Sequence, residues 1–460
     1  MKNETSTNGH SGNDCCSCGG HSNKSRMPRR LLLGLGLAVV IGVWLFRAPL
    51  QELIRNKATL ANDAPNSETV ADMIEQAADP RAALLTAWNS GKIVHREVAI
   101  SSLRRVFPNN KPLSPEFESI LLAAALDPDM NVREVSLGIL HERNHPALTA
   151  LAAEQLKDPD QQVRLLGLNH LKQAAPAVGV PFAAALLDDA DIAVLGMSLK
   201  LLENWSGQKF GSKVVDTVQV ENKTTGLQEF QAEGIAKTKA AAENAKAWSA
   251  EHQSEFPPVK LEVPAEAYTA RRPVPAAEFE LRTLEGKTVR LSDFRGKVVL
   301  MNFWTTWCSA CVGEMPALVA LQKKHSDKLV IIGVSLDYVP DSHGHIGGHA
   351  AVEEQKHSDG EHDDHEATAA ALKRVREKVA RTAKARRVNY PVLLDEKNDV
   401  GGRYNGGELP TTVIVDAQGN LRRRFIGARN IAVFEAMIAE AAQSPTSART
   451  SDSNRTAQAH

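Results

Sequence analysis

WTTWCSACVGEMP, residues 304–316, places two cysteines three positions apart at the junction of two predicted elements. Residues 298–303 before it form a nearly continuous apolar run, as expected of a buried central strand in a parallel arrangement. Residues 312–324 after it have a helical pattern that Pro316 interrupts. Cys308 therefore lies at a helix N-terminus, where free N–H groups and the helix dipole favour a thiolate. Cys311, one turn further, is close enough to resolve a mixed disulfide.

Three interpretations of this cysteine pair are open: a redox site, half of a metal site, or two buried thiols. A tetrahedral zinc site needs a second pair of ligands, and no such pair lies near in the sequence. The chain has five cysteines in two clusters, Cys308/Cys311 and Cys15/Cys16/Cys18. Clustered cysteines are not the scattered framework of a disulfide-stapled protein. The pattern favours redox chemistry at Cys308 and Cys311.

The sequence around the pair predicts an α/β domain over residues 278–442. A further strand is expected at 329–336, the segment YPVLLD follows at 390–395, and a hairpin turns at residues 418–420. Long helices are expected at 368–387 and 431–442. Strands that alternate with helices in this way predict a mixed sheet covered by helices. Residues 254–277 are Pro-rich and are expected to form a semi-rigid linker, and 443–460 a disordered tail.

The residues of this domain resemble the thioredoxin superfamily, also described as the redoxin or AhpC-TSA superfamily. The resemblance is carried by Trp304, Trp307, Cys308, Cys311 and Glu314 in their spacing before Pro316, and by Leu409-Pro410-Thr411-Thr412 nearly a hundred residues later. Within the superfamily the pattern is most similar to membrane-anchored thiol–disulfide oxidoreductases of the TlpA and ResA type. A peroxiredoxin pattern, Pro-x-x-x-Thr-x-x-Cys, is absent from the sequence.

The resemblance implies roles for particular residues. Cys308 would attack, Cys311 would resolve, Glu314 would tune the thiol protons, and Pro410 would be cis and face the disulfide. Trp304, Trp307, Leu409 and Thr411 would contact the substrate. No cofactor is expected, and a membrane or soluble thiol reductant would reset the pair. The implied activity is reduction of protein disulfides outside the cytoplasm, for example in apocytochrome c before haem attachment.

Two positions depart from the family pattern. Ala310 stands where many members have Pro, and the residues between the cysteines help to set the reduction potential. Asn302 stands where thioredoxin itself has a buried Asp, which shifts the expected proton role toward Glu314. The direction of electron flow is therefore left open by the sequence.

Residues 70–253 predict a helical region with an internal repeat. The segments 126–140, 156–171 and 187–202 align so that Val132, Val163 and Val194 share one position, 31 residues apart each time. The pattern predicts an α-solenoid of helix pairs and resembles HEAT repeats of the PBS-lyase type. The Asp-Pro-Asp turns are expected to cap the second helix of each pair. An Ala/Lys-rich helix over about 227–252 would close the array, and the implied role is a docking surface for a partner protein.

The N-terminal sequence predicts a membrane anchor. Residues 31–46 carry no charge and follow a disordered tail at 1–30. The run is short for a full span, but no cleavage motif follows it, which favours an uncleaved signal-anchor over a signal peptide. The basic residues before it favour a cytoplasmic N-terminus, so the rest of the chain would be periplasmic or otherwise extracytoplasmic, held by a single pass in the inner membrane. The net charge of −1 does not indicate a nucleic-acid partner.

Three further motifs have an ordinary and a functional interpretation. HERNH at 141–145 matches a zincin motif, but Pro146 biases His145 away from helix, so an inter-repeat turn is expected. The insertion 342–366 is expected to be either a solvated loop or a weak copper or zinc buffer. Its six histidines are His343, His345, His349, His357, His362 and His365. Cys15, Cys16 and Cys18 are either reduced thiols in a tail or, with His10 and His21, ligands for a soft metal.

The alternative to an oxidoreductase is therefore a non-enzymatic scaffold. It would use the helical repeats for docking and the histidine-rich insertion for metal buffering or delivery.

Overall fold

The fold comes from a computed structural model that describes residues 67–108, 111–212, 219–221, 228–230, 232–337 and 364–443. The predicted anchor at 31–46, the two predicted tails and the Cys15–Cys18 cluster lie outside these residues. Across the described ranges, none of the helices combines the length and the apolar character that crossing a bilayer requires.

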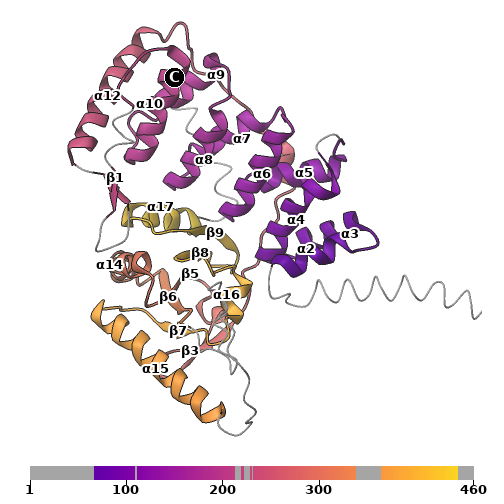
Figure 1. The fold of residues 1–460 in the computed structure, drawn as a ribbon, viewed down its shortest axis with the longest axis vertical. Coiled ribbons are helices and arrows are strands. Elements are labelled where there is room, and N and C mark those ends of the chain that lie inside the picture. The colour runs from indigo at the N-terminus through magenta and orange to yellow at the C-terminus, as the bar shows by residue number, and fades with distance from the viewer. Residues whose placement is uncertain are drawn as a thin grey trace, which may run out of the picture. The chain divides into compact units, whose positions relative to one another are not determined.

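A run of helices forms the N-terminal part of the described chain (Figure 1). Its helices are α2 (Ser67–Glu75), α3 (Pro80–Asn89), α4 (Ile93–Val106), α5 (Pro115–Ala124), α6 (Met130–Glu142), α7 (Leu148–Gln155), α8 (Gln161–Leu171), α9 (Pro176–Ala184) and α10 (Ile192–Ser206). Val132, Val163 and Val194 are all buried, on α6, α8 and α10 respectively. Two apolar clusters run through this region, because each helix buries one face against its neighbours.

The Asp-Pro-Asp turns cap helices as the repeat predicts. Asp129 begins α6 and its side chain accepts from the N–H of Asn131 at 3.0 Å. Asp160 begins α8 in the same way through the N–H of Gln162. In the third repeat the turn reads Asp-Ala-Asp, and its Asp191 begins α10. Each aspartate satisfies an N–H group that has no partner within its helix. The prediction for these caps is confirmed.

The segment after α10 differs from the sequence prediction. The helix α12 spans Ala232–Glu251, whereas helix was predicted from residue 227. Before it lie two short paired strands, β1 (Gln219–Glu221) and β2 (Gln228–Phe230). A strand thus occupies the start of the predicted helix, because antiparallel pairing with β1 supplies the backbone hydrogen bonds there. Helix propensity alone did not reveal this strand pairing.

The Pro-rich segment predicted as a linker is partly folded. It contains the short helix α13 (Ala265–Thr269), whose Ala267 is buried in the same apolar cluster as α5. Val274 and Ala276 are buried in the core of the domain that follows. The backbone of this segment pairs with that domain, since Leu421 N–H donates to Val274 O at 2.7 Å. The segment therefore packs against both regions that it connects.

The C-terminal domain is built on a five-stranded sheet with the order β7-β6-β5-β8-β9. The strands β5 (Val298–Trp304), β6 (Leu329–Ser335) and β7 (Val392–Leu394) are parallel, and β8 (Thr411–Val415) and β9 (Leu421–Ile426) are antiparallel. Every residue of β5 is buried, as a central strand covered on both faces requires. The predicted mixed sheet is confirmed.

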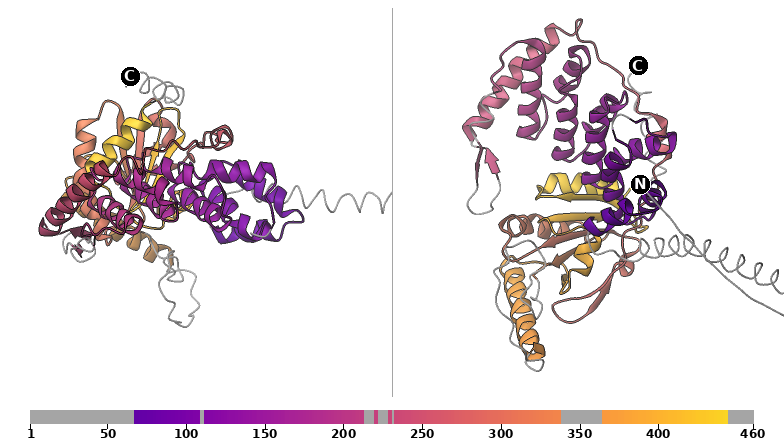
Figure 2. Two further views of the ribbon diagram at one scale, coloured as in Figure 1. Left: turned by 90° about the horizontal axis from the view of Figure 1, so that it is seen from above. Right: turned by 45° about the vertical axis from the view of Figure 1, so that its right-hand side comes forward.

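Helices cover both faces of the sheet (Figures 1 and 2). On one face α14 (Ser309–Lys324) and α17 (Ile431–Ala441) bury Leu318, Leu321 and Phe434 against alternate residues of β5. The other face of the sheet carries the remaining residues of β5, Val299, Met301 and Phe303. They are covered by α16 (Asp399–Arg403) and by the hairpin of β3 (Glu280–Arg282) and β4 (Thr288–Arg290). The helix α15 (Asp364–Ala385) lies beside β7, and Val379 and Ala383 pack near the start of α14.

The two regions meet along β9 and the loop after it. The backbone of Arg424 in β9 donates to Pro128 O at 3.0 Å, within the first Asp-Pro-Asp turn. Three arginines of the C-terminal domain bind aspartates of the helical region: Arg424 with Asp129, Arg423 with Asp158, and Arg429 with Asp160. All six side chains are buried, so the contact belongs to the core of the molecule.

Candidate redox-active site

The cysteine pair lies at the carboxyl end of β5, where the strand turns into α14. Cys308 is the N-cap of α14, and its sulfur accepts from the N–H of Cys311 at 3.2 Å. The two cysteines form a disulfide with an S–S distance of 2.10 Å. Cys311 is fully buried, and Cys308 lies at the edge of exposure. The sulfur that a partner can reach is therefore that of Cys308, the thiol closest to the helix N-terminus.

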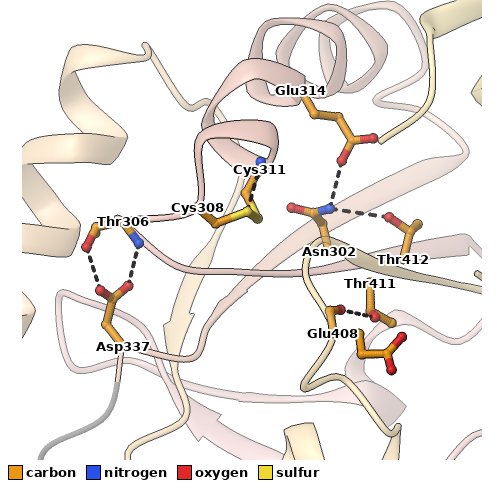
Figure 3. Close-up of a disulfide and its surroundings, with 9 residues drawn as sticks. All are labelled: Asn302, Thr306, Cys308, Cys311, Glu314, Asp337, Glu408, Thr411 and Thr412. Atoms are coloured by element: carbon orange, nitrogen blue, oxygen red, sulfur yellow. Dashed lines mark hydrogen bonds between the residues drawn. A yellow bond between two sulfur atoms is a disulfide. The ribbon is translucent and has the colours of Figure 1, made fainter. Parts of the chain in front are cut away.

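A second segment, distant in sequence, completes the site. The bond Leu409–Pro410 is cis, as the family resemblance implies, and it directly precedes β8. Thr411 pairs with Phe303 of β5, which brings this loop beside the end of the strand that carries the cysteines. The Thr411 hydroxyl donates to Glu408 O at 2.5 Å and holds the loop from within (Figure 3). Leu409 packs against the cluster that contains both cysteines.

The four predicted substrate-contacting residues do not share one environment. Trp307, beside Cys308, is 71% exposed and offers an apolar surface to a partner. Trp304 is 1% exposed and packs beneath the disulfide with Met315 and Val379, so it supports the site and does not face a substrate. The prediction that Trp304 contacts substrate does not fit its burial, because even-numbered residues of β5 point toward the covered α14 face. Thr411 is also buried, and Leu409 is half-buried.

Glu314 lies one helical turn after Cys311 and is 3% exposed. Its Oε2 accepts from Asn302 Nδ2 at 3.1 Å, and its Oε1 accepts from the backbone N–H of Arg429 at 2.7 Å. Burial raises the pKa of Glu314 to about 7, against the lowering effect of these hydrogen bonds and of the Arg429 charge. A carboxyl with this pKa can take up or give a proton near neutral pH.

Asn302 connects Glu314 to the sheet. Its Nδ2 also donates to Thr412 Oγ1 at 3.3 Å, so an amide from β5 joins the helix carboxylate to β8 (Figure 3). An amide does not titrate, so among Asn302 and Glu314 only the glutamate can exchange a proton. This geometry is consistent with the shift of the proton role from position 302 to Glu314.

The loop between β5 and Cys308 is anchored by an aspartate that sequence analysis missed. Asp337, just after β6, accepts from the Thr306 N–H at 2.9 Å and from the Thr306 hydroxyl at 2.5 Å. Ser335 at the end of β6 donates to the same carboxylate at 3.0 Å. The Asp337 carboxylate thus fixes Thr306, the residue directly before Trp307. A polar residue immediately after a buried parallel strand was the available signal.

Arg429 and Tyr390 were also missed by sequence analysis. Arg429 supplies an N–H to Glu314 from the loop after β9. Burial raises the pKa of Tyr390, and the charge of the nearby Glu314 carboxylate raises it further. Neither residue lies in a recognisable motif, because each reaches the site through tertiary packing.

The remaining candidate sites are not assembled in the described part of the chain. Within it, no group of His, Cys, Asp or Glu side chains could hold a metal ion. His343, His345, His349, His357 and His362 lie outside the described residues, and the backbone alone of His365 is described, in α15. HERNH forms a turn as predicted: α6 ends at Glu142, and His145 Nε2 lies 3.0 Å from Glu118 Oε1.

These features together define a class of protein. A dithiol at the start of a helix, a cis-proline loop beside it and a buried carboxyl on the same helix allow one chemistry above others, the exchange of a disulfide with a partner through Cys308. The chain is a thiol–disulfide oxidoreductase with a thioredoxin-like fold.

Comparison with known proteins agrees with this class. The model of the AhpC/TSA family matches residues 273–424. The thioredoxin-like protein YneN of Bacillus subtilis is 31% identical over 152 residues, which are 33% of this chain and 69% of that protein. The thiol-disulfide oxidoreductase ResA of Bacillus cereus is 30% identical over 152 residues, covering 33% of this chain and 68% of its own. The chain belongs to the AhpC/TSA family, as a thiol–disulfide oxidoreductase of the ResA type.

Solved structures also resemble a part of the chain. The pneumococcal exposed lipoprotein thioredoxin of Streptococcus pneumoniae is 25% identical and covers 36% of this chain and 99% of its own, with a TM-score of 0.25.

Proposed function

We propose that the protein is a membrane-anchored reductase of protein disulfides that works outside the cytoplasm. The observation that carries the redox part is the pairing of a nearly buried, helix-capping Cys308 with an exposed Trp307. The anchor rests on the apolar residues 31–46 and on the basic residues before them. The direction, reductase, and a substrate class such as an apocytochrome c disulfide rest on the resemblance to ResA.

The proposed reaction moves two electrons from the dithiol to the partner. The Cys308 thiolate attacks one sulfur of the partner disulfide, and the other partner sulfur leaves as a thiolate and takes a proton from water. Cys311 then gives its proton to the Glu314 carboxylate and attacks the Cys308 sulfur. The second partner sulfur leaves, and the chain is left with the Cys308–Cys311 disulfide seen in this structure. An upstream thiol reductant would reset the pair.

The reduction potential of Cys308–Cys311 tests the direction. Titration of the full chain against dithiothreitol or glutathione, followed by alkylation of free thiols, measures it directly. The proposal expects a value near that of thioredoxin, about −270 mV. A value near about −120 mV, typical of a strong oxidant, would overturn the reductase assignment while leaving the oxidoreductase class intact.

Fractionation of cells tests the anchor. The full chain is expected in the membrane fraction and to resist extraction by high salt, and a variant lacking residues 1–46 is expected in the soluble fraction. Protease added to spheroplasts should digest the C-terminal domain if it is extracytoplasmic. A full chain that fractionates with soluble proteins would contradict the anchor.

We further propose that α5 to α10 form a HEAT-like solenoid that selects the partner. Support comes from the 31-residue spacing of buried valines and from the shared aspartate caps. The Asp-Pro-Asp turns at residues 127–129 and 158–160 already contact the chain's own redox domain. A docked protein would therefore use another face of the helices. Full-length variants with charge-reversing substitutions on the exposed face of α5 to α10 that still engage the same partners would contradict this role.

A further inference from the structure

The side chain of Arg429 binds the helical region. Its Nε and Nη2 donate to the two carboxylate oxygens of Asp160 at 2.8 and 3.0 Å. The Arg429 side chain is 3% exposed and that of Asp160 is 1% exposed. Two parallel hydrogen bonds between a guanidinium and a carboxylate fix orientation as well as distance. The position of Arg429 is therefore set by a residue of the helical repeats.

The same guanidinium holds its own loop in shape. Arg429 Nη1 donates to the carbonyl oxygens of Ile426, Gly427 and Ala428 at 3.0 to 3.2 Å. The loop bends back at Gly427, whose φ of 88° is favourable for glycine alone among common residues. The loop from β9 to α17 is thus wrapped around a charge that Asp160 neutralises.

The backbone N–H of Arg429 binds Glu314 of the redox domain. It donates to Glu314 Oε1 at 2.7 Å, and both residues are buried. The groups that act on Glu314 or respond to its charge are Arg429, Tyr390 and the amide of Asn302. The two cysteines, bonded as a disulfide, lie at the start of the helix that carries Glu314. Asp160 therefore lies two contacts from the carboxyl that we propose as proton acceptor.

We propose that Asp160 and Arg429 are positioning residues for the redox reaction. Asp160, in the helical repeats, fixes the Arg429 side chain, and this holds the Arg429 backbone N–H against Glu314 next to Cys311. The repeats then act on proton transfer at the disulfide in addition to any role in binding partners. This inference rests on the proton role proposed for Glu314.

A matched pair in the same chain supplies the control. Asp129 occupies the equivalent turn position, caps α6, and holds Arg424 at 3.0 and 3.2 Å from its two carboxylate oxygens. The other contacts of Arg424 are with Tyr404 O and Asn405 O, at 2.8 and 2.6 Å. Arg424 makes no hydrogen bond to Glu314 among those in the described chain. Loss of Asp129 therefore weakens the contact between the helical region and the redox domain but removes no hydrogen bond to Glu314.

The test measures oxidation of the reduced full-length protein by oxidised glutathione between pH 5 and 9. The rate is compared in the wild type, Asp160→Asn, Asp129→Asn, Arg429→Met and Arg429→Lys. Thermal unfolding of each oxidised variant confirms that it is folded. Loss of the two hydrogen bonds between Arg429 and Asp160 should let the loop after β9 move. The hydrogen bond from the Arg429 N–H to Glu314 should then lengthen, which disfavours the ionised carboxylate and raises the pKa of Glu314. The midpoint of the rate profile should then rise by about half a pH unit or more in Asp160→Asn and Arg429→Met.

The outcomes separate positioning from a general effect of charge or stability. An upward shift in Asp160→Asn that is absent in Asp129→Asn, with partial recovery in Arg429→Lys, supports the proposal. A downward shift means that the unpaired Arg429 charge acts on Glu314 through space, which overturns positioning. Equal shifts in both Asn variants, or none, also overturn it.

The substitution Asp160→Asn is also made in a Glu314→Gln variant. This comparison shows whether Asp160 acts through Glu314, and it distinguishes a failure of this inference from a failure of the proposed function. In this background Asp160→Asn should leave the pH midpoint unchanged, because the two effects act through one carboxyl. A midpoint shift that persists in Glu314→Gln would overturn the inference. If Glu314→Gln itself leaves the wild-type profile unchanged, the proton role of Glu314 has failed, and the inference with it.

Discussion

At the scale of the residue, Glu314 shows how burial makes an ordinary side chain reactive near neutral pH. Its carboxyl is removed from water, and its two hydrogen bonds do not offset the lost hydration, so its pKa rises to about 7. Sequence analysis identified this residue through its match to an acidic residue near the active site of the thioredoxin superfamily. It did not identify Arg429, which donates the shorter of the two hydrogen bonds from a loop 115 residues away.

The raised pKa predicts a pH-dependent stability that Glu314→Gln removes. Between pH 4.5 and about 7 the folded protein holds a proton on Glu314 that the unfolded chain releases, so wild-type stability falls as pH rises through this window. Relative to Glu314→Gln, the oxidised wild type should lose on the order of 2–3 kcal/mol of unfolding free energy from pH 4.5 to pH 8. Urea unfolding at both pH values measures it. A difference between the two proteins that does not change with pH would contradict the raised pKa.

At the scale of the element, the site is made where strand ends meet. β5 carries the cysteines into α14, β6 ends at Asp337, and β8 begins after the cis-proline loop. Parallel strands present their carboxyl ends on one edge of a sheet, so Asp337 reaches the Thr306 loop through adjacent strands. This arrangement follows from the apolar pattern of β5 and β6, which the sequence displays.

Asp337→Ala should loosen the segment that holds Trp307 beside Cys308. The Thr306 N–H would lose its acceptor, at a cost of about 1–3 kcal/mol in stability, and the rate of attack on a protein disulfide should fall. Thr306→Val is the milder control, because it removes the hydroxyl bond and keeps the backbone one. Insulin reduction and thermal unfolding of both variants measure the effects. Equal activity in Asp337→Ala and wild type would show that the anchor is dispensable.

Other elements were predictable in kind but not in detail. The repeats and their aspartate caps follow from the spacing of valines and aspartates, and the strand β5 follows from its unbroken apolar run. The β1–β2 pairing overrides the helical propensity of its second strand, and the burial of α13 depends on contacts with a distant segment, so local propensity encodes neither. The burial of Trp304 could not be predicted either, because a motif gives the spacing of residues and not the face of the strand on which each one lies.

At the scale of the whole molecule, the helical region and the redox domain share a buried, charged junction. Residues 56–460 form one compact unit, within which Asp129, Asp158 and Asp160 bind arginines of β9 and the following loop. Each aspartate comes from an Asp-Pro-Asp turn, so one motif both caps a helix and binds an arginine of the other region. The sequence displays the turns and the arginines but not their pairing.

Arg424→Met should destabilise the protein by about 3–5 kcal/mol, because it leaves Asp129 buried without its partner. Arg104→Met is the matched control: its pair with Glu142 is exposed, and its loss should cost less than about 1 kcal/mol. Unfolding followed by circular dichroism, which reports the helical region, and by tryptophan fluorescence measures both. Equal costs for the two substitutions would contradict a junction that holds the regions together.

The most direct test of the central claim, that Cys308 exchanges disulfides with a protein partner, is the identity of the trapped sulfur. The reduced full-length Cys311→Ser variant is mixed with a disulfide-bonded protein such as insulin, and the product is digested and analysed by mass spectrometry. We expect a mixed disulfide at Cys308, which accumulates because the resolving thiol is gone. A variant that forms no adduct at Cys308, together with a wild type that does not reduce insulin, would contradict it.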